Sequence, residues 1–152
     1  MIEKAYETLA KKHGLPAFED LDQEFDLKSI EDTRRFSASI RKKILERIEP
    51  VAEFVEHLLQ PDVNSLADMY ECKYVDSEDK THLFVCFRKL MKAYKSFLEL
   101  ELLRSEKEDC HFITTFVKEW EQIKKELLPI VIKMKFSWST PTESKEVLEY
   151  LG

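Results

Sequence analysis

The sequence predicts an all-α protein, a single-domain helical bundle of three long helices with shorter helices at its start, middle and end. Apolar residues recur every three or four positions along most of the chain, which is the spacing of one helix face. Only 2 of the 152 residues are glycine, too few for the turns of an all-β sandwich. With 43% hydrophobic residues, a chain of this length can bury the core of one domain.

Two short helices are predicted at the N-terminus. The first has an apolar face formed by Ile2, Tyr6 and Leu9. Gly14 ends it, because glycine adopts the left-handed backbone of a helix C-terminus without strain. Pro16 suits the first position of the second helix, since the amide that proline lacks would have no helical acceptor there.

The first long helix is predicted over residues 29–60, with Ser29 and Asp32 resembling an N-terminal cap. From Phe36 onward its apolar stripe continues in steps of three or four, straight through Pro50. Proline in a helix interior removes one hydrogen bond and bends the helix. Because the apolar spacing is unbroken, we predict one kinked helix and not two separate ones.

The second half of the chain is predicted to hold the other two long helices. A short helix within 62–75 precedes a long helix that begins at Ser77. The last long helix begins with the capping box Ser105–Glu108 and contains Pro129, which predicts a second kink.

One domain is therefore predicted over residues 1–138. The remaining residues, 139–152, are predicted to form a short C-terminal helix or a loosely attached tail, with Val147, Leu148 and Leu151 on one side. No stretch rich in Gly, Ser or Pro separates further domains.

Composition favours a cytoplasmic protein that needs no cofactor and no membrane. The N-terminus is charged throughout and no apolar run approaches the length of a membrane span. Cys72, Cys86 and Cys110 lack metal-binding or redox spacing, so we expect three reduced thiols. A net charge of −6 weighs against a dedicated nucleic-acid binder, although basic patches can occur locally.

No catalytic residue is predicted, and the protein is expected not to be an enzyme. The nearest motif is Glu108-x-x-His111, which has the spacing of di-metal helical bundles. Such a site needs a second copy, and Glu53, Glu56 and His57 do not repeat the spacing. A metal-dependent enzyme therefore remains the least favoured alternative, and no metal ligand is assigned.

The favoured function is protein–protein interaction or scaffolding, with a protein partner or a homodimer. Along the last long helix the apolar steps from Ile113 are close to a heptad repeat, typical of helices that pack nearly parallel or antiparallel. The predicted interface residues are Trp120, Ile123, Leu127 and Ile130.

An alternative function is binding of the phosphate backbone of RNA or DNA. Basic residues gather on two helix faces, and those chosen as candidate phosphate ligands are Arg34, Arg41, Arg88 and Lys92. Acidic residues follow directly on the first of these helices, so ordinary solvated faces compete with this interpretation.

Overall fold

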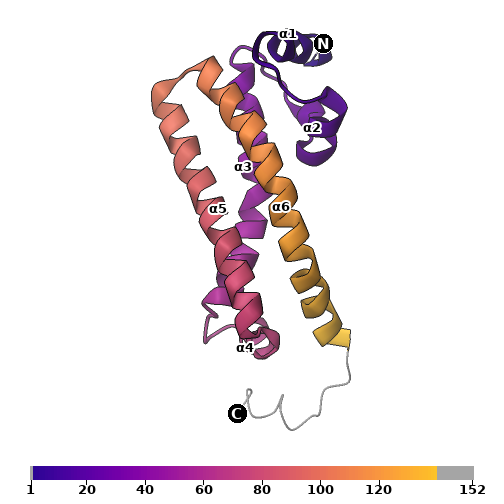
Figure 1. Cartoon of the computed structure of the whole chain (residues 1–152), viewed down its shortest axis with the longest axis vertical. Helices are drawn as coiled ribbons and strands as arrows, with labels where there is room; N and C mark the ends of the chain where they lie inside the picture. Colours follow the sequence, from indigo (N-terminus) through magenta and orange to yellow (C-terminus); the bar gives the residue numbers. More distant parts are fainter. Residues whose placement is uncertain (1, 140–152) are drawn as a thin grey trace. The chain divides into compact units, whose positions relative to one another are not determined.

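The computed structural model describes residues 2–139, and within this range it contains α-helices and two short 3-10 helices but no strand (Figure 1). The α-helices are α1 (Ile2–His13), α2 (Phe18–Phe25), α3 (Phe36–Leu59), α4 (Leu66–Glu71), α5 (Ser77–Leu103) and α6 (Glu106–Ser139). The 3-10 helices are η1 (Leu27–Ser29) and η2 (Cys72–Tyr74). The predicted all-α class is confirmed, with three long helices of 24, 27 and 34 residues.

The chain forms two compact units. Among the described residues, unit 1 consists of residues 2–50 and 90–120, and unit 2 of residues 51–89 and 121–139. Each of the three long helices contributes one segment to each unit. The predicted C-terminal helix or tail lies outside the described residues, except for Ser139, the last residue of α6.

Aromatic side chains join the short N-terminal helices to the long helices of unit 1. The Tyr6 ring meets Phe18 at 5.3 Å and Phe36 at 6.5 Å between ring centroids, both edge to face. The Tyr6 hydroxyl donates to the backbone oxygen of Pro16. Gly14 has φ +70° and ends α1 as predicted, with its amide donating to the Ala10 oxygen at 2.7 Å.

The helix α3 begins at Phe36, seven residues later than the predicted start at residue 29. Ile30 is buried, but its backbone is extended (φ −71°, ψ 123°). The Asp32 carboxylate accepts the Arg34 amide at 3.0 Å, which closes a local turn in place of a helical one. Ile30 is therefore buried although it lies outside any helix, and its position in the sequence imitated the apolar spacing of a helix.

Both helices with internal prolines continue through them, as the apolar spacing predicts. Pro50 lies inside α3 and Pro129 inside α6. In each case the carbonyl four residues earlier has no helical amide to accept, because proline lacks the donor. The kinks themselves stay predictions.

The predicted cap of α6 is confirmed, and α5 begins at Ser77 as predicted. The Ser105 hydroxyl accepts the Glu108 amide at 3.3 Å. At the start of α5, Asp76 and Asp79 accept each other's amides at 2.8 and 3.2 Å. Asp76, the residue before the first helical residue, thus caps α5.

In unit 2, α4 and α6 contact each other through aromatic residues. The Tyr70 hydroxyl donates to the Ser137 backbone oxygen at 2.8 Å. The Trp138 indole donates to Glu71 at 2.8 Å, and its ring lies 4.2 Å from that of Tyr70. Across the described range, none of the helices has the length and hydropathy needed to cross a membrane.

Candidate functional site

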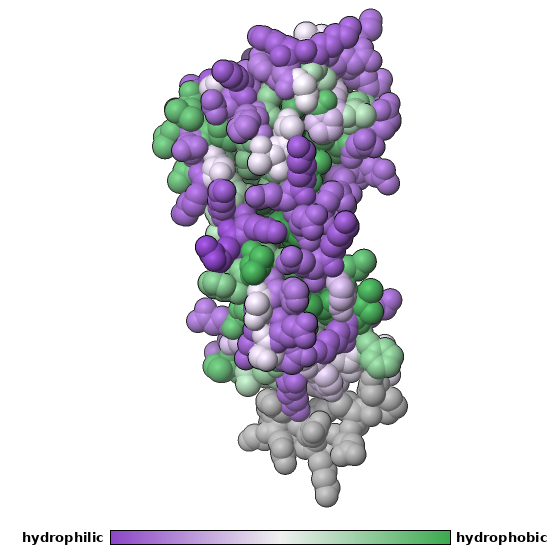
Figure 2. Space-filling model, viewed as in Figure 1, coloured by the Kyte–Doolittle hydropathy of each residue, from purple (hydrophilic) through white to green (hydrophobic). Residues whose placement is uncertain are grey.

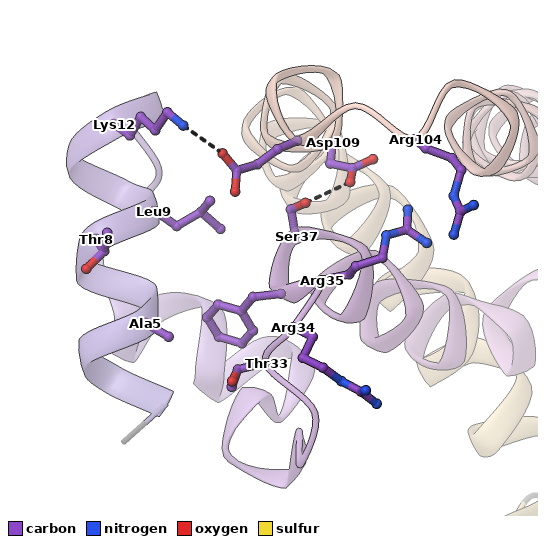
Figure 3. Close-up of a pocket in the computed structure, with 12 residues that line it drawn as sticks. Ala5, Thr8, Leu9, Lys12, Thr33, Arg34, Arg35, Ser37, Arg104 and Asp109 are labelled. Carbon is purple, nitrogen blue, oxygen red and sulfur yellow. Dashed lines mark hydrogen bonds and ion pairs between the residues drawn. The ribbon is translucent and has the colours of Figure 1, made fainter.

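A pocket of about 470 Å³ lies in unit 1, between α1 and the starts of α3 and α6 (Figure 3). Four basic and two acidic side chains line it, with apolar residues on the α1 side. The lining residues are Ala5, Thr8, Leu9, Lys12, Thr33, Arg34, Arg35, Phe36, Ser37, Arg104, Glu106 and Asp109. Its volume lies in the range of small-molecule sites.

The deep wall of the pocket holds a buried acid, Asp109, whose side chain is 2% exposed. One carboxylate oxygen, Oδ2, accepts the Ser37 hydroxyl at 2.7 Å (Figure 3). The other, Oδ1, lies 2.7 Å from Nε of Arg41, a fully buried guanidinium. Arg41 Nη2 also lies 3.1 Å from Glu101 Oε1, and the Phe97 ring centroid is 4.9 Å from the guanidinium carbon.

These contacts are close ion pairs with poor hydrogen-bond alignment. No guanidinium N–H of Arg41 makes a hydrogen bond to any described residue, although two of its nitrogens are within ion-pair distance of carboxylates. Arg41 therefore neutralises Asp109 by charge more than by directed bonding. Because both groups are buried, removing Arg41 leaves the charge of Asp109 without compensation, whereas removing Asp109 leaves Arg41 with Glu101 as an acidic partner.

The basic side of the pocket is formed by Arg35 and Arg104, whose side chains point toward one another in Figure 3. Neither forms an ion pair with any residue that the structure describes. Arg34 differs, because its guanidinium lies 3.1 Å from the Asp32 carboxylate. Lys12 also differs, with its amine 3.2 Å from Glu106 (Figure 3).

The position of Arg104 follows from the short connection between α5 and α6. Its amide donates to the Leu100 oxygen at 2.9 Å and its φ is +53°, so it ends α5 in a left-handed conformation. Only Ser105 then separates it from the first residue of α6. The tight turn brings the guanidinium to the pocket beside the first turn of α3.

Neighbouring cations offset the carboxylates around the pocket. The pKa of Glu106 is lowered, first by its hydrogen bond with His13 at 3.0 Å and then by that with Lys12. The pKa of Asp32 is lowered by its hydrogen bonds with the Arg34 side chain and amide. The acids that line the pocket are thus paired with other cations, and Arg35 and Arg104 have no ion-pair partner among the described residues.

The four predicted phosphate ligands do not share one environment. Arg41 is a correction to the sequence prediction, because it is buried against Asp109 and is not available at the surface. Arg34 is exposed at the pocket, while Arg88 and Lys92 are exposed on α5. Sequence analysis missed Asp109, although it lies four positions before Ile113 and therefore on the core face of α6.

The four predicted interface residues are all in the interior. The exposed fractions of Trp120, Ile123, Leu127 and Ile130 are 2%, 0%, 5% and 3%. The Trp120 indole donates to Glu24 at 2.9 Å, and its ring packs with Phe25 at 6.3 Å. The near-heptad seam is thus covered by the chain's own helices.

The cysteines and the Glu108-x-x-His111 motif lie in the following environments. Burial, followed by the contact with Glu126, raises the pKa of Cys86 to about 12. Burial, followed by nearby acids, raises the pKa of Cys110 to about 12. Glu108 and His111 are exposed, and in the described range no group of three or more metal-ligating side chains is assembled.

A second candidate surface lies on unit 2, where α6 exposes apolar side chains on its outer face. Leu128 is 59% exposed and Ile132 is 56% exposed, one turn apart. Val131 beside them is 41% exposed. Figure 2 shows hydrophobic side chains at the surface among hydrophilic ones in the part of the view that holds the C-terminal half of α6.

No family model, curated protein or solved structure matches this chain. Function is therefore inferred from two features of the molecule itself. One is the basic pocket of unit 1, and the other is the exposed apolar face of α6 in unit 2.

Proposed function

We propose that this protein is non-enzymatic and acts through protein–protein contacts, forming a homodimer through the outer face of α6 in unit 2. The observation that carries the proposal is a second heptad-like stripe on the exposed side of that helix. Its residues are Glu121, Lys125, Leu128, Ile132 and Lys135, all exposed and separated by steps of 4, 3, 4 and 3. Such steps place side chains along one face that a second helix can cover.

The stripe has an apolar centre with charged residues at both ends. Leu128 and Ile132 form the centre, and helical periodicity places them opposite the buried Ile123 and Ile130. Contiguous exposed apolar side chains of this kind are typical of interaction surfaces, because covering them removes hydrocarbon from water.

The charges on the stripe favour a second copy of this chain as the partner. In an antiparallel pair with the two Leu128 side chains facing each other, residues 121 and 135 lie opposite, because each is seven positions from Leu128. Glu121 of one chain then faces Lys135 of the other, and two-fold symmetry repeats the pair. The arrangement is therefore self-complementary in charge.

The small size of the apolar centre limits the expected affinity of the dimer. Stable interfaces bury roughly 800 Å² on each partner, whereas this centre consists of Leu128 and Ile132 with Val131 beside them. We therefore expect a weak dimer with a dissociation constant on the order of 1–100 μM.

A non-enzymatic role and a cytoplasmic location are parts of the same proposal. The buried thiols of Cys86 and Cys110 have raised pKa values, which makes them poor nucleophiles. All three cysteines are free, as expected in a reducing compartment.

Sedimentation equilibrium of the full chain from about 1 to 500 μM tests the proposal, since this range spans the expected dissociation constant. The wild type should show a concentration-dependent dimer, and Leu128→Glu should remain monomeric. Leu102→Glu is the matched control, because Leu102 is 80% exposed on α5 in unit 1. A wild type that stays monomeric throughout, or a dimer that survives Leu128→Glu, would contradict the proposal.

A charge exchange tests the antiparallel arrangement. Lys135→Glu alone should weaken the dimer several-fold, about 1 kcal/mol, because it places two acids opposite each other. Adding Glu121→Lys should restore most of the affinity. Failure of the double variant to recover would exclude this pairing of the two copies.

A further inference from the structure

We propose that the pocket of unit 1 binds a small organic phosphate monoester, with Arg35 and Arg104 holding the phosphate group. This inference is independent of the proposed dimer, which uses residues of unit 2. It rests on the converging arginines, on the neutralised acids around them and on the apolar wall of the pocket.

The first step of the argument is the charge of the two arginines. Their side chains point toward one another in Figure 3, and neither has a carboxylate partner in the described part of the chain. Two guanidinium groups that point toward the same space repel each other, so an anion between them removes an unfavourable interaction. Guanidinium groups bind phosphate oxygens with paired N–H donors, which suits a dianion better than a single carboxylate.

The second step is that the nearby acids do not oppose such an anion. Asp109 is 2.7 Å from the buried Arg41, and Glu106 is bound by both Lys12 and His13. Each carboxylate that lines the pocket thus has its own cationic partner. The net −6 charge of the chain makes this local positive excess distinctive.

The third step is the contribution of the backbone at the start of α3. Its first turn, at Phe36 and Ser37, lines the pocket and contains no acidic side chain. The first amides of a helix have no acceptor within the helix, and the helix dipole is positive at this end. These amides add donors beside Arg35 and support the two arginines without defining the site by themselves.

The last step concerns the rest of the ligand. A pocket of about 470 Å³ is much larger than a phosphate group needs, and Ala5, Leu9 and Phe36 provide apolar walls. A phosphate with an organic body of modest size would use both the basic and the apolar sides. Inorganic phosphate would use only the basic side.

Isothermal titration of the full chain with phenyl phosphate and with inorganic phosphate tests the assignment. We expect saturable binding of both, with phenyl phosphate at least about fivefold tighter because its ring leaves water. Arg35→Gln and Arg104→Gln should each weaken phenyl phosphate binding by at least about tenfold. Backbone amide shifts of Ser37 should move on titration with either ligand.

The controls separate a specific site from general attraction of anions. Arg88→Gln removes an exposed arginine in unit 2 and should leave binding unchanged. Circular dichroism and unfolding midpoints should show that all three variants remain folded. No saturable binding at millimolar concentrations, or equal losses in Arg88→Gln and Arg35→Gln, would overturn the proposal.

Two further ligands test the chemical class. Benzoate that binds as tightly as phenyl phosphate would replace the phosphate assignment by a carboxylate. A single-stranded oligonucleotide that binds more tightly than phenyl phosphate, and loses affinity equally in Arg35→Gln and Arg88→Gln, would indicate a nucleic-acid surface instead.

Discussion

Each unit contains an ion pair of 2.7 Å, but the two pairs differ in burial: both partners are buried in unit 1, whereas in unit 2 the histidine is more than half exposed and only the carboxylate is buried. In unit 1, Arg41 Nε lies 2.7 Å from Asp109, with side chains that are 0% and 2% exposed. In unit 2, His57 Nδ1 also lies 2.7 Å from Asp68, with side chains that are 55% and 10% exposed. The distance alone does not distinguish them.

Burial decides what each pair contributes to stability. Water screens an exposed pair and solvates whichever partner is left behind, so breaking it costs little. A buried partner left behind keeps an uncompensated charge, so breaking the pair costs far more than the pair itself contributes. In unit 1, removing Arg41 therefore leaves a buried charge behind, whereas in unit 2 the Asp62 amide still donates to Asp68 when His57 is removed.

The largest expected effect is the removal of Arg41. Arg41→Met leaves Asp109 charged and buried, and should lower the free energy of unfolding by about 3–5 kcal/mol. The matched substitution in unit 2 is Lys133→Met, which breaks an ion pair of 2.6 Å to Asp79 with the lysine 40% exposed. It should cost less than about 1 kcal/mol. Urea denaturation measures both.

A double variant identifies the cause of the Arg41 effect. Adding Asp109→Asn to Arg41→Met removes the stranded charge while keeping an acceptor for Ser37, and should recover a large part of the loss. Equal losses for Arg41→Met and Lys133→Met would show that burial does not determine the stability cost of breaking an ion pair in this protein.

A smaller effect, equal in both units, is expected for neutral hydrogen bonds. Tyr6 donates to Pro16 in unit 1 and Tyr70 donates to Ser137 in unit 2, each to a backbone oxygen. Both rings are buried, at 1% and 6% exposed. Tyr6→Phe and Tyr70→Phe should each cost about 1–2 kcal/mol in urea denaturation. A several-fold difference would mean that the units differ in more than their charges.

The smallest expected effect is the pH dependence of the stability contributed by the His57–Asp68 pair. The hydrogen bond with Asp68 and its charge raise the pKa of His57 above the ordinary 6.5. This contribution is complete below pH 6.5 and is lost as the pH rises through the higher folded value. Unfolding midpoints should therefore fall as the pH rises above 6.5 and through the raised pKa of His57, and His57→Gln should reduce that fall.

The stability contributed by Asp68, the acid of the same pair, depends on pH in the opposite direction. Burial alone would raise the pKa of Asp68, but hydrogen bonds from the Asp62 amide and from His57 outweigh it and lower the pKa. Its contribution is present above the ordinary 3.8 and is lost as the pH falls below it. A His57 pKa at or below 6.5 by NMR titration would contradict this account of the pair.

The helices were predictable because their signals are local. The apolar spacing of α3 continues through Pro50, Gly14 ends α1, and the Ser105 hydroxyl caps the start of α6. Each signal depends only on residues within a turn or two. The late start of α3 escaped prediction because Ile30 is buried without being helical.

The candidate site was less predictable because it joins residues distant in sequence. Arg35 and Arg104 line the same pocket only because unit 1 packs their segments of the chain together. Apolar spacing also cannot distinguish a helix face covered by the same chain from one covered by a partner, so Trp120 suggested an interface and is core. One signal was available: Arg41 lies between Ser37 and Ile44 on the buried face of α3, where a charge requires a partner.

The left-handed backbone of Arg104 has a consequence for how this chain can be altered. Glycine adopts φ +53° freely, whereas a residue with a β-carbon is strained there by about 1 kcal/mol. Arg104→Gly should therefore raise thermal stability while abolishing retention on a phosphate-bearing resin. A laboratory selection for heat resistance alone would favour that exchange, and one that also demands ligand capture would retain the arginine.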